Sequence, residues 1–170
     1  KIAIESDSEQ VIGSYVFLWG QKQERTPTWY GMFLDDGSET ETVDVMHYIW
    51  NGEWPDNRTP RIGSMLLDSK SAYDGVVVEA GGQYQAVVDV SDPDGDPLRF
   101  EWEVFRESEA TQAGGDAESV PEKIPGLIEG SETHSVNVTA PSAEGAYRLF
   151  VYIHDGAGNA AHANIPFLVQ

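Results

Sequence analysis

The chain contains no cysteine. This absence excludes a disulfide framework, a thiol nucleophile and a zinc site built from thiolates, and it leaves the redox compartment open. Basic residues are also scarce, because 10 Lys and Arg stand against 29 Asp and Glu and give a formal net charge of −19. Such a charge argues against nucleic acid and anionic membrane surfaces as partners and favours cations or neutral ligands.

Long apolar runs are missing as well. None approaches the roughly 20 residues that a membrane-spanning helix needs. The opening Lys1-Ile2-Ala3-Ile4-Glu5 lacks the form of a signal peptide, so for an exported protein we expect the signal to lie upstream. The four histidines show no helical pairing typical of zinc sites, and we interpret His154 and His162 as surface or edge residues of neighbouring strands.

A rigid acidic turn, Asp92-Pro93-Asp94-Gly95-Asp96-Pro97, separates two stretches of alternating apolar and polar residues at 83–90 and 99–104. The alternation predicts two strands, each buried on one face. Carboxylates at alternate positions of such a turn suit Ca²⁺, which prefers oxygen ligands. The alternative is that Asp and Pro serve only as good turn residues.

Further strands are predicted at 61–67, 74–80, 135–139, 146–154 and 161–169, with a short apolar stretch at 124–129. Turn residues separate these runs. About seven strands with turn signals every 8 to 12 residues are typical of an immunoglobulin-like β-sandwich, so the fold class is mainly β.

The first third of the chain has a different composition, since it holds four of the five tryptophans, Trp19, Trp29, Trp50 and Trp54. The apolar residues 11–18 predict a strand buried on both faces, as in a parallel sheet. A polar loop and an Asp35-Asp36-Gly37 turn follow, and then a helix that opens at Thr42 and stops at Asn51-Gly52. Residues 53–62 have the two prolines and the polar density of a linker. We therefore place a boundary near Asn57, which divides the chain into 1–57 and 58–170.

The acidic turn, the Trp-containing strand after it and the later His154-Asp155-Gly156-Ala157-Gly158-Asn159 resemble the immunoglobulin-like modules of the PKD and cadherin-like type found in secreted bacterial proteins. The resemblance covers about residues 58–170. It implies a secreted, periplasmic or cell-surface location and a structural Ca²⁺ ion. Its implied ligands are Asp92, Asp94 and Asp96, with Asp155 and Glu79 as further contributors.

The segment 14–33, with Trp19-Gly20, Trp29-Tyr30-Gly31 and the following Asp36-Gly37 turn and helix, resembles the last βα unit of a (β/α)₈-barrel glycoside hydrolase. The resemblance implies that Trp19 forms the floor of a sugar subsite and that Gln21, Arg25 and Trp29 belong to the loop over it. Active sites of such barrels lie at the C-terminal ends of the strands. The catalytic carboxylates of that family come from earlier strands, which this chain does not contain, so we expect no catalysis by this chain alone.

The leading hypothesis is therefore the C-terminal accessory portion of a secreted carbohydrate-active enzyme. Its partners would be an upstream catalytic barrel and a polysaccharide or oligosaccharide. Two alternatives remain: a carbohydrate-binding module that uses Trp19 and Trp29, and a non-enzymatic surface or adhesion module. Solvent exposure of the two tryptophans separates a sugar role from packing.

Overall fold

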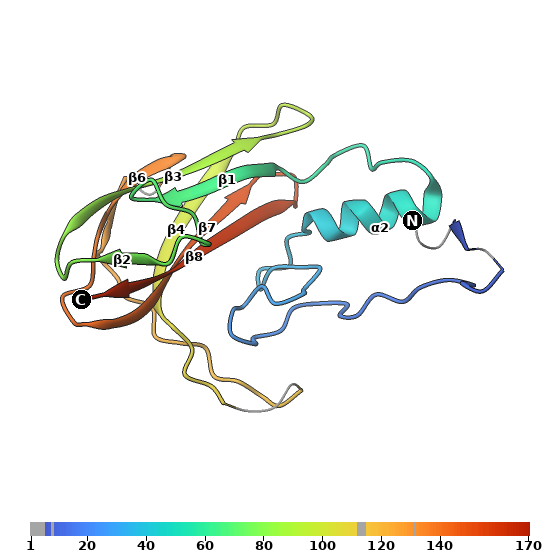
Figure 1. Ribbon diagram of the computed structural model, residues 1–170. Coiled ribbons are helices and arrows are strands. Elements are labelled where there is room, and N and C mark those ends of the chain that lie inside the picture. The colour runs from blue at the N-terminus through green and yellow to red at the C-terminus, as the bar shows by residue number, and fades with distance from the viewer. Residues whose placement is uncertain (1–5, 8, 112–114, 131) are drawn as a thin grey trace.

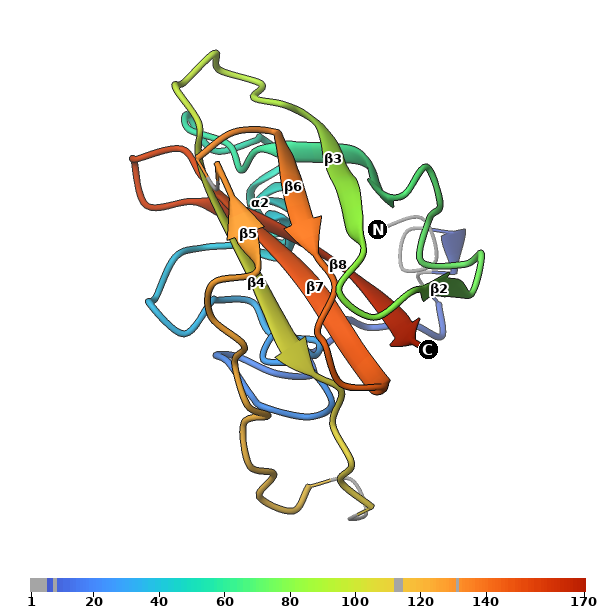
Figure 2. The same cartoon turned by 90° about the vertical axis from the view of Figure 1, so that its left-hand side faces the viewer.

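The structure is a computed structural model that describes residues 6, 7, 9–111, 115–130 and 132–170. The first five residues, to which the signal-peptide argument applies, lie outside these ranges. The fold is mainly β, with two four-stranded sheets in an arrangement compatible with a β-sandwich (Figures 1 and 2). In the described part of the chain no helix has the length and apolar character needed to cross a membrane.

The first sheet has the strand order β1-β3-β6-β5 and the second has the order β2-β8-β7-β4. The first contains β1 (Arg61–Leu67), β3 (Gln83–Ser91), β6 (Ser135–Thr139) and β5 (Ile128–Glu129). The second contains β2 (Val76–Val78), β8 (Ala160–Val169), β7 (Gly145–His154) and β4 (Arg99–Arg106). All neighbouring strands are antiparallel except β2 and β8. The strands predicted between residues 61 and 169 are thus confirmed.

The core lies between the two sheets and draws on both. Met65 and Val88 of the first sheet belong to the same buried cluster as Trp102, Val104 and Val151 of the second. Successive side chains of a strand point to opposite faces. The residues between these therefore point away from the core, and in β4 and β7 they form the outward face on which the candidate site is built.

Helix α2 (Glu41–Asn51) begins and ends close to where the sequence predicts. The side chain of Thr40 caps its first turn by accepting a hydrogen bond from the amide of Thr42 (3.4 Å). At the other end Gly52 has φ 81°, a left-handed conformation that glycine adopts without strain, and its amide donates to the carbonyl of Tyr48 (2.9 Å).

The strand expected at residues 11–18 does not form. These residues have no regular secondary structure, and Ile12 and Tyr15 are fully exposed. A strand needs neighbours for its N–H and C=O groups, and no other described segment pairs with this one. The barrel-like unit is therefore not seen in this chain.

The residues before and after α2 are hydrogen-bonded to one end of the sandwich, which lies opposite the C-terminus in Figure 1. The amide of Glu39 donates to the carbonyl of Gly158 (2.9 Å), and the amide of Ala160 donates to the carbonyl of Glu39 (2.8 Å). The buried carboxylate of Asp44 on α2 accepts the amide of Thr59 (2.8 Å). These bonds join residues on the two sides of the boundary that we place near Asn57.

Candidate functional site

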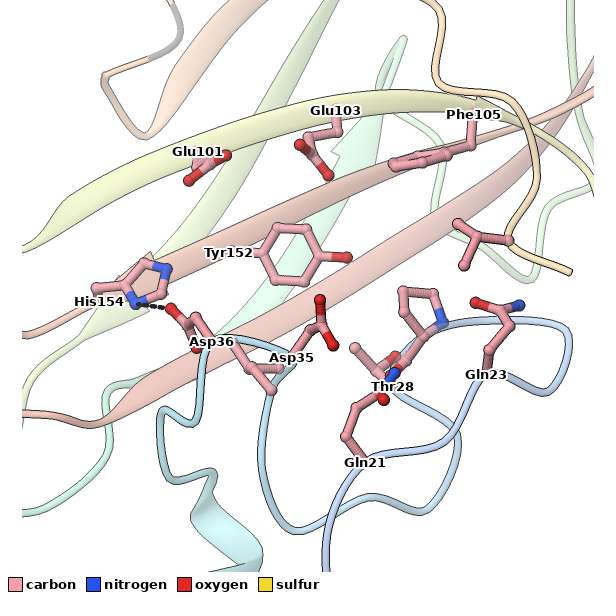
Figure 3. Close-up of a pocket in the computed structure, with 13 residues that line it drawn as sticks. Gln21, Gln23, Thr28, Asp35, Asp36, Glu101, Glu103, Phe105, Tyr152 and His154 are labelled. Atoms are coloured by element: carbon pink, nitrogen blue, oxygen red, sulfur yellow. Dashed lines mark hydrogen bonds and ion pairs between the residues drawn. The ribbon is translucent and has the colours of Figure 1, made fainter.

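A cleft of about 400 Å³ lies between the loop of residues 21–36 and the outward face of β4 and β7 (Figure 3). The loop contributes Gln21, Gln23, Pro27, Thr28, Leu34, Asp35 and Asp36, and the sandwich contributes Glu101, Glu103, Phe105, Val120, Tyr152 and His154. Small-molecule sites are concave and combine apolar walls with a few polar groups. This cleft has both kinds of lining.

The strand register explains why the sandwich side of the cleft is acidic and aromatic. Glu101 lies opposite Tyr152, and Glu103 lies opposite Phe150, across the β4–β7 pair. Residues opposite each other in an antiparallel pair point to the same face. The ring of Phe150 stacks on Tyr152 at 6.0 Å between centroids and meets Phe105 edge-on at 5.6 Å. The face therefore carries a row of rings beside a row of carboxylates.

The phenol of Tyr152 lies among these carboxylates. Figure 3 shows the side chains of Asp35 and Glu103 directed toward it from the two walls. Burial in the first place, and the charges of Glu103, Glu101 and Asp35 in the second, raise the pKa of Tyr152 well above its usual value. The hydroxyl group stays protonated and serves as a hydrogen-bond donor at the centre of the cleft.

At one end of the cleft Asp36 faces His154. Its Oδ2 lies 3.8 Å from Nδ1 of the imidazole, and its Oδ1 accepts the amide of Ser38 (2.9 Å). Burial opposes ionisation of Asp36, but the hydrogen bonds from Ser38 and the electrostatic interaction with His154 outweigh it and keep the pKa of Asp36 below its usual value. This carboxylate is therefore already engaged within the protein.

The two polar residues that the sequence places over a sugar site lie in different surroundings. Gln21 lines the cleft, where its Nε2 donates to the carbonyl of Pro27 (2.8 Å). Arg25 binds the segment after β4 instead. Its amide donates to both carboxylate oxygens of Glu118 (3.0 and 3.1 Å), and its Nη1 donates to the carbonyl of Ser108 (3.2 Å).

The two tryptophans assigned to sugar binding lie in separate aromatic clusters. Trp19 is 64% exposed and stacks on Trp50 at 6.5 Å between ring centroids. Trp29 is partly buried and meets Tyr30 and Phe17 edge-on at 4.7 and 5.6 Å. Neither tryptophan lines the cleft. Trp19 thus packs on Trp50 and, edge-on at 5.7 Å, on Phe33, and it still presents most of its surface to solvent.

The acidic turn uses its carboxylates for internal hydrogen bonds. Oδ1 of Asp92 accepts the amides of Asp94 (2.9 Å) and Asp96 (3.0 Å), and Oδ2 of Asp94 accepts the amide of Arg58 (2.7 Å). The other oxygen of Asp92 is buried and has no hydrogen bond within the described ranges. The carboxylates therefore stabilise the turn through hydrogen bonds, as the alternative interpretation of the sequence expects. Asp92 Oδ2 differs, because it is buried and accepts no hydrogen bond among the described residues.

Asp155 is buried, and both of its carboxylate oxygens are occupied. Oδ1 accepts the amides of Ala157 (2.7 Å) and Asn159 (3.0 Å), and Oδ2 accepts Nδ2 of Asn57 (2.7 Å). Asp155 therefore shapes the turn between β7 and β8 and holds the linker. In the part of the chain that the structure describes, no three carboxylate or imidazole groups gather as a set of metal ligands.

The sequence did not single out the cleft residues on β4 and β7. The alternating pattern assigns Glu101 and Glu103 to the polar face of a strand. The sequence predicts a surface or edge position for His154 and His162. The side chain of His154 is instead only 12% exposed. His162 lies mostly buried, and loss of hydration lowers its pKa. The reason is that the segment before β1 covers part of this face, which strand alternation alone cannot reveal.

No family model matches the chain, and no curated protein matches it either. Among solved structures, the chain is similar to a nucleoside hydrolase-related protein from Saccharophagus degradans that is associated with carbohydrate metabolism, at 21% identity and a TM-score of 0.40. That match covers 67% of this chain and 26% of the other, so it spans about a quarter of the Saccharophagus protein.

Two further matches among solved structures are a copper resistance protein and a soluble domain. The copper resistance protein PcoC from Escherichia coli has 14% identity and a TM-score of 0.39, over 66% of this chain and 99% of PcoC. The soluble domain of PmoD from Methylocystis has 14% identity and a TM-score of 0.36, over 69% and 95%. Similarities of this strength carry no argument about function.

Proposed function

We propose that this chain is the C-terminal accessory portion of a secreted bacterial carbohydrate-active enzyme, a glycoside hydrolase whose catalytic barrel precedes it in the polypeptide. In this proposal residues 1–57 complete the last strand and helix of that barrel, and residues 58–170 form an immunoglobulin-like module of the PKD or cadherin-like type. The chain has no catalytic activity of its own and acts next to the barrel that binds the polysaccharide.

The observation that carries the proposal is the uneven distribution of exposed apolar side chains. Within residues 12–54 those exposed are Ile12, Tyr15, Phe17, Trp19, Tyr30, Val45, Trp50 and Trp54. Several touch one another, as the stacked pair Trp19 and Trp50 does. Soluble monomers rarely leave contiguous apolar surface uncovered, and where they do it commonly marks a binding surface. A preceding barrel would cover this surface.

Two features of the sandwich favour the immunoglobulin-like part of the proposal. Trp102 is buried on β4, and its Nε1 donates to the carbonyl of Thr133 (2.9 Å). Tyr147, near the start of β7, donates its hydroxyl hydrogen to the carbonyl of Ala143 four residues upstream (3.0 Å). A buried Trp in one sheet and a Tyr that bonds back to the preceding corner are hallmarks of immunoglobulin-like sandwiches.

Calcium belongs to the proposal as a structural ion at the acidic turn. The supporting feature is the buried Oδ2 of Asp92, which has no hydrogen bond among the described residues. Asp94 and Asp96 lie in the same turn, whereas Asp155 already accepts three hydrogen bonds at the β7–β8 corner. In this proposal the ion therefore lies at the turn.

The test compares this chain with a longer polypeptide that carries the proposed barrel upstream of it. Hydrogen exchange at residues 11–19 should be fast in this chain and slow in the longer polypeptide, and only the longer one should hydrolyse polysaccharides such as cellulose, xylan, mannan or laminarin. Ile12→Ser and Tyr15→Ser, at two fully exposed positions, should destabilise only the longer polypeptide, with the exposed Tyr73→Ser as the matched control. Equal exchange in both, with no hydrolysis by either, would disprove the proposal.

A carbohydrate-binding module is the second candidate, and the exposure of Trp19 favours it. An accessible indole offers an apolar face to the C–H side of a sugar ring. This candidate predicts that Trp19→Ala abolishes saccharide binding by this chain, while Trp54→Ala, on the other side of α2, leaves it intact.

A further inference from the structure

We infer that the cleft between residues 21–36 and the outward face of β4 and β7 binds a neutral saccharide unit. The inference deepens the proposed function and rests on it, because it gives the accessory portion its own contact with the polysaccharide. The site is separate from the exposed Trp19 and Trp29, since neither tryptophan lines the cleft.

The cleft offers polar groups that have no hydrogen-bond partner. The carboxylate of the exposed Asp35 takes part in no hydrogen bond or ion pair among the described residues, and the side-chain amide of Gln23 is buried with neither its oxygen nor its nitrogen in a hydrogen bond. Buried polar groups are costly when they stay unpaired. A ligand for this cleft should therefore bring both donors and acceptors, and the hydroxyl groups of a sugar are both.

The centre of the cleft supplies the complementary donor and an apolar surface. The hydroxyl group of Tyr152 has no hydrogen bond among the described residues, and Figure 3 shows it between Asp35 and Glu103. The ring of Phe105 also lines the cleft. A sugar ring has hydroxyl groups at its edge and C–H groups on its faces, so a carboxylate, a phenol and an aromatic ring match it in three places. The volume of about 400 Å³ is in the range of small-ligand sites.

The charge distribution favours a neutral ligand over a cation. Glu103 is paired with Lys123, Glu101 with Arg99 (3.4 Å), and Asp36 faces His154 (3.8 Å). Three of the four carboxylates in the lining thus already face a basic side chain. The cleft therefore presents one unpaired carboxylate, that of Asp35, beside the neutral polar groups of Gln23 and Tyr152.

The experiment is calorimetric titration of this chain with cellotriose, xylotriose, mannotriose, laminaritriose and N-acetylchitotriose, with glucosamine as a cationic probe. At least one neutral trisaccharide should bind saturably. Asp35→Ala and Tyr152→Phe should each weaken that binding about tenfold, as expected for the loss of one good hydrogen bond. The exposed Glu144→Ala and Tyr73→Phe are the matched controls and should bind like the parent chain. Urea midpoints near the parent value show that the variants remain folded.

Three results would overturn the inference. They are the absence of binding by every trisaccharide at 10 mM, binding by glucosamine alone, and binding that Trp19→Ala removes while both cleft variants retain it. These results are independent of the test of the proposed function, which measures hydrolysis and exchange at residues 11–19 in the longer polypeptide. The failure of the inference and the failure of the proposed function can therefore be told apart.

Discussion

Replacing Asp155 tests whether this residue, expected from the sequence to bind calcium, instead stabilises the fold directly. It is 4% exposed and accepts three hydrogen bonds, from the amides of Ala157 and Asn159 and from the side chain of Asn57. Hydrogen bonds to a charged group contribute about 1.5–3 kcal/mol each, but relaxation of the turn makes the sum smaller than the parts. We expect Asp155→Ala to lower the free energy of unfolding by about 3–5 kcal/mol, a large share of the stability of a small domain.

The measurement is urea unfolding monitored by tryptophan fluorescence, in EDTA so that no metal contributes. Asp155→Asn should lose only about 1–2 kcal/mol, because its amide oxygen still accepts the two backbone amides and Asn57 can rotate its own amide to match. Asp116→Ala, an exposed carboxylate removed in the same way, controls for the change in net charge. A loss below about 1 kcal/mol for Asp155→Ala in EDTA, the range of an exposed ion pair, would refute the assigned role.

Three further predictions concern calcium, pH and the sandwich corner. Thermal unfolding in EDTA and in CaCl₂ should show that Ca²⁺ raises the free energy of unfolding by about 2.7 kcal/mol at 100 times the Kd. Asp92→Asn, which keeps the hydrogen bonds that Oδ1 accepts in the turn, should remove this gain. Equal midpoints of the parent chain in the two solutions would exclude the ion. Because burial lowers the pKa of His162 below its ordinary 6.5, the unfolded chain takes up the proton first. Stability should then be complete above about pH 6.5 and fall below it, and His162→Gln should flatten the fall in urea midpoint between pH 7 and 5.5; parallel falls would contradict this. Tyr147→Phe loses the hydrogen bond to Ala143 and should lower the free energy of unfolding in urea by about 1 kcal/mol. An unchanged midpoint would show that this hydrogen bond does not stabilise the fold.

Most of the sandwich could be predicted because its sequence alternates with period two. In β4 the buried Trp102 and Val104 alternate with Glu101 and Glu103, so the pattern gives both the strand and its inward face. Helix α2 was equally legible, since Thr40 and Gly52 supply the local chemistry of its two ends. In both cases neighbouring residues along the chain contain the information.

The cleft could not be predicted in the same way, because it depends on which segment covers the outward face of a sheet. Nothing in the sequence near Tyr152 shows that Asp35 will lie beside it, more than a hundred positions away. The hydrogen bonds that bring the two segments together, such as those of Glu39 with Gly158 and Ala160, are made by backbone groups that every residue possesses. The pattern of side chains along the sequence therefore does not predict these hydrogen bonds.

The failure at residues 11–18 is different in kind and is informative. This run has the apolar, β-branched and aromatic composition of a strand buried on both faces, yet Ile12 and Tyr15 are wholly exposed and the chain there is irregular. Natural sequences are locally consistent with their native structures, and conflicts between the two concentrate at functional sites. Both faces of this segment suit burial, yet Ile12, Tyr15 and Phe17 are exposed, and Val16 and Leu18 are only partly buried. The conflict is resolved if another part of the protein supplies strands on either side, which is the arrangement that the proposed upstream barrel would provide.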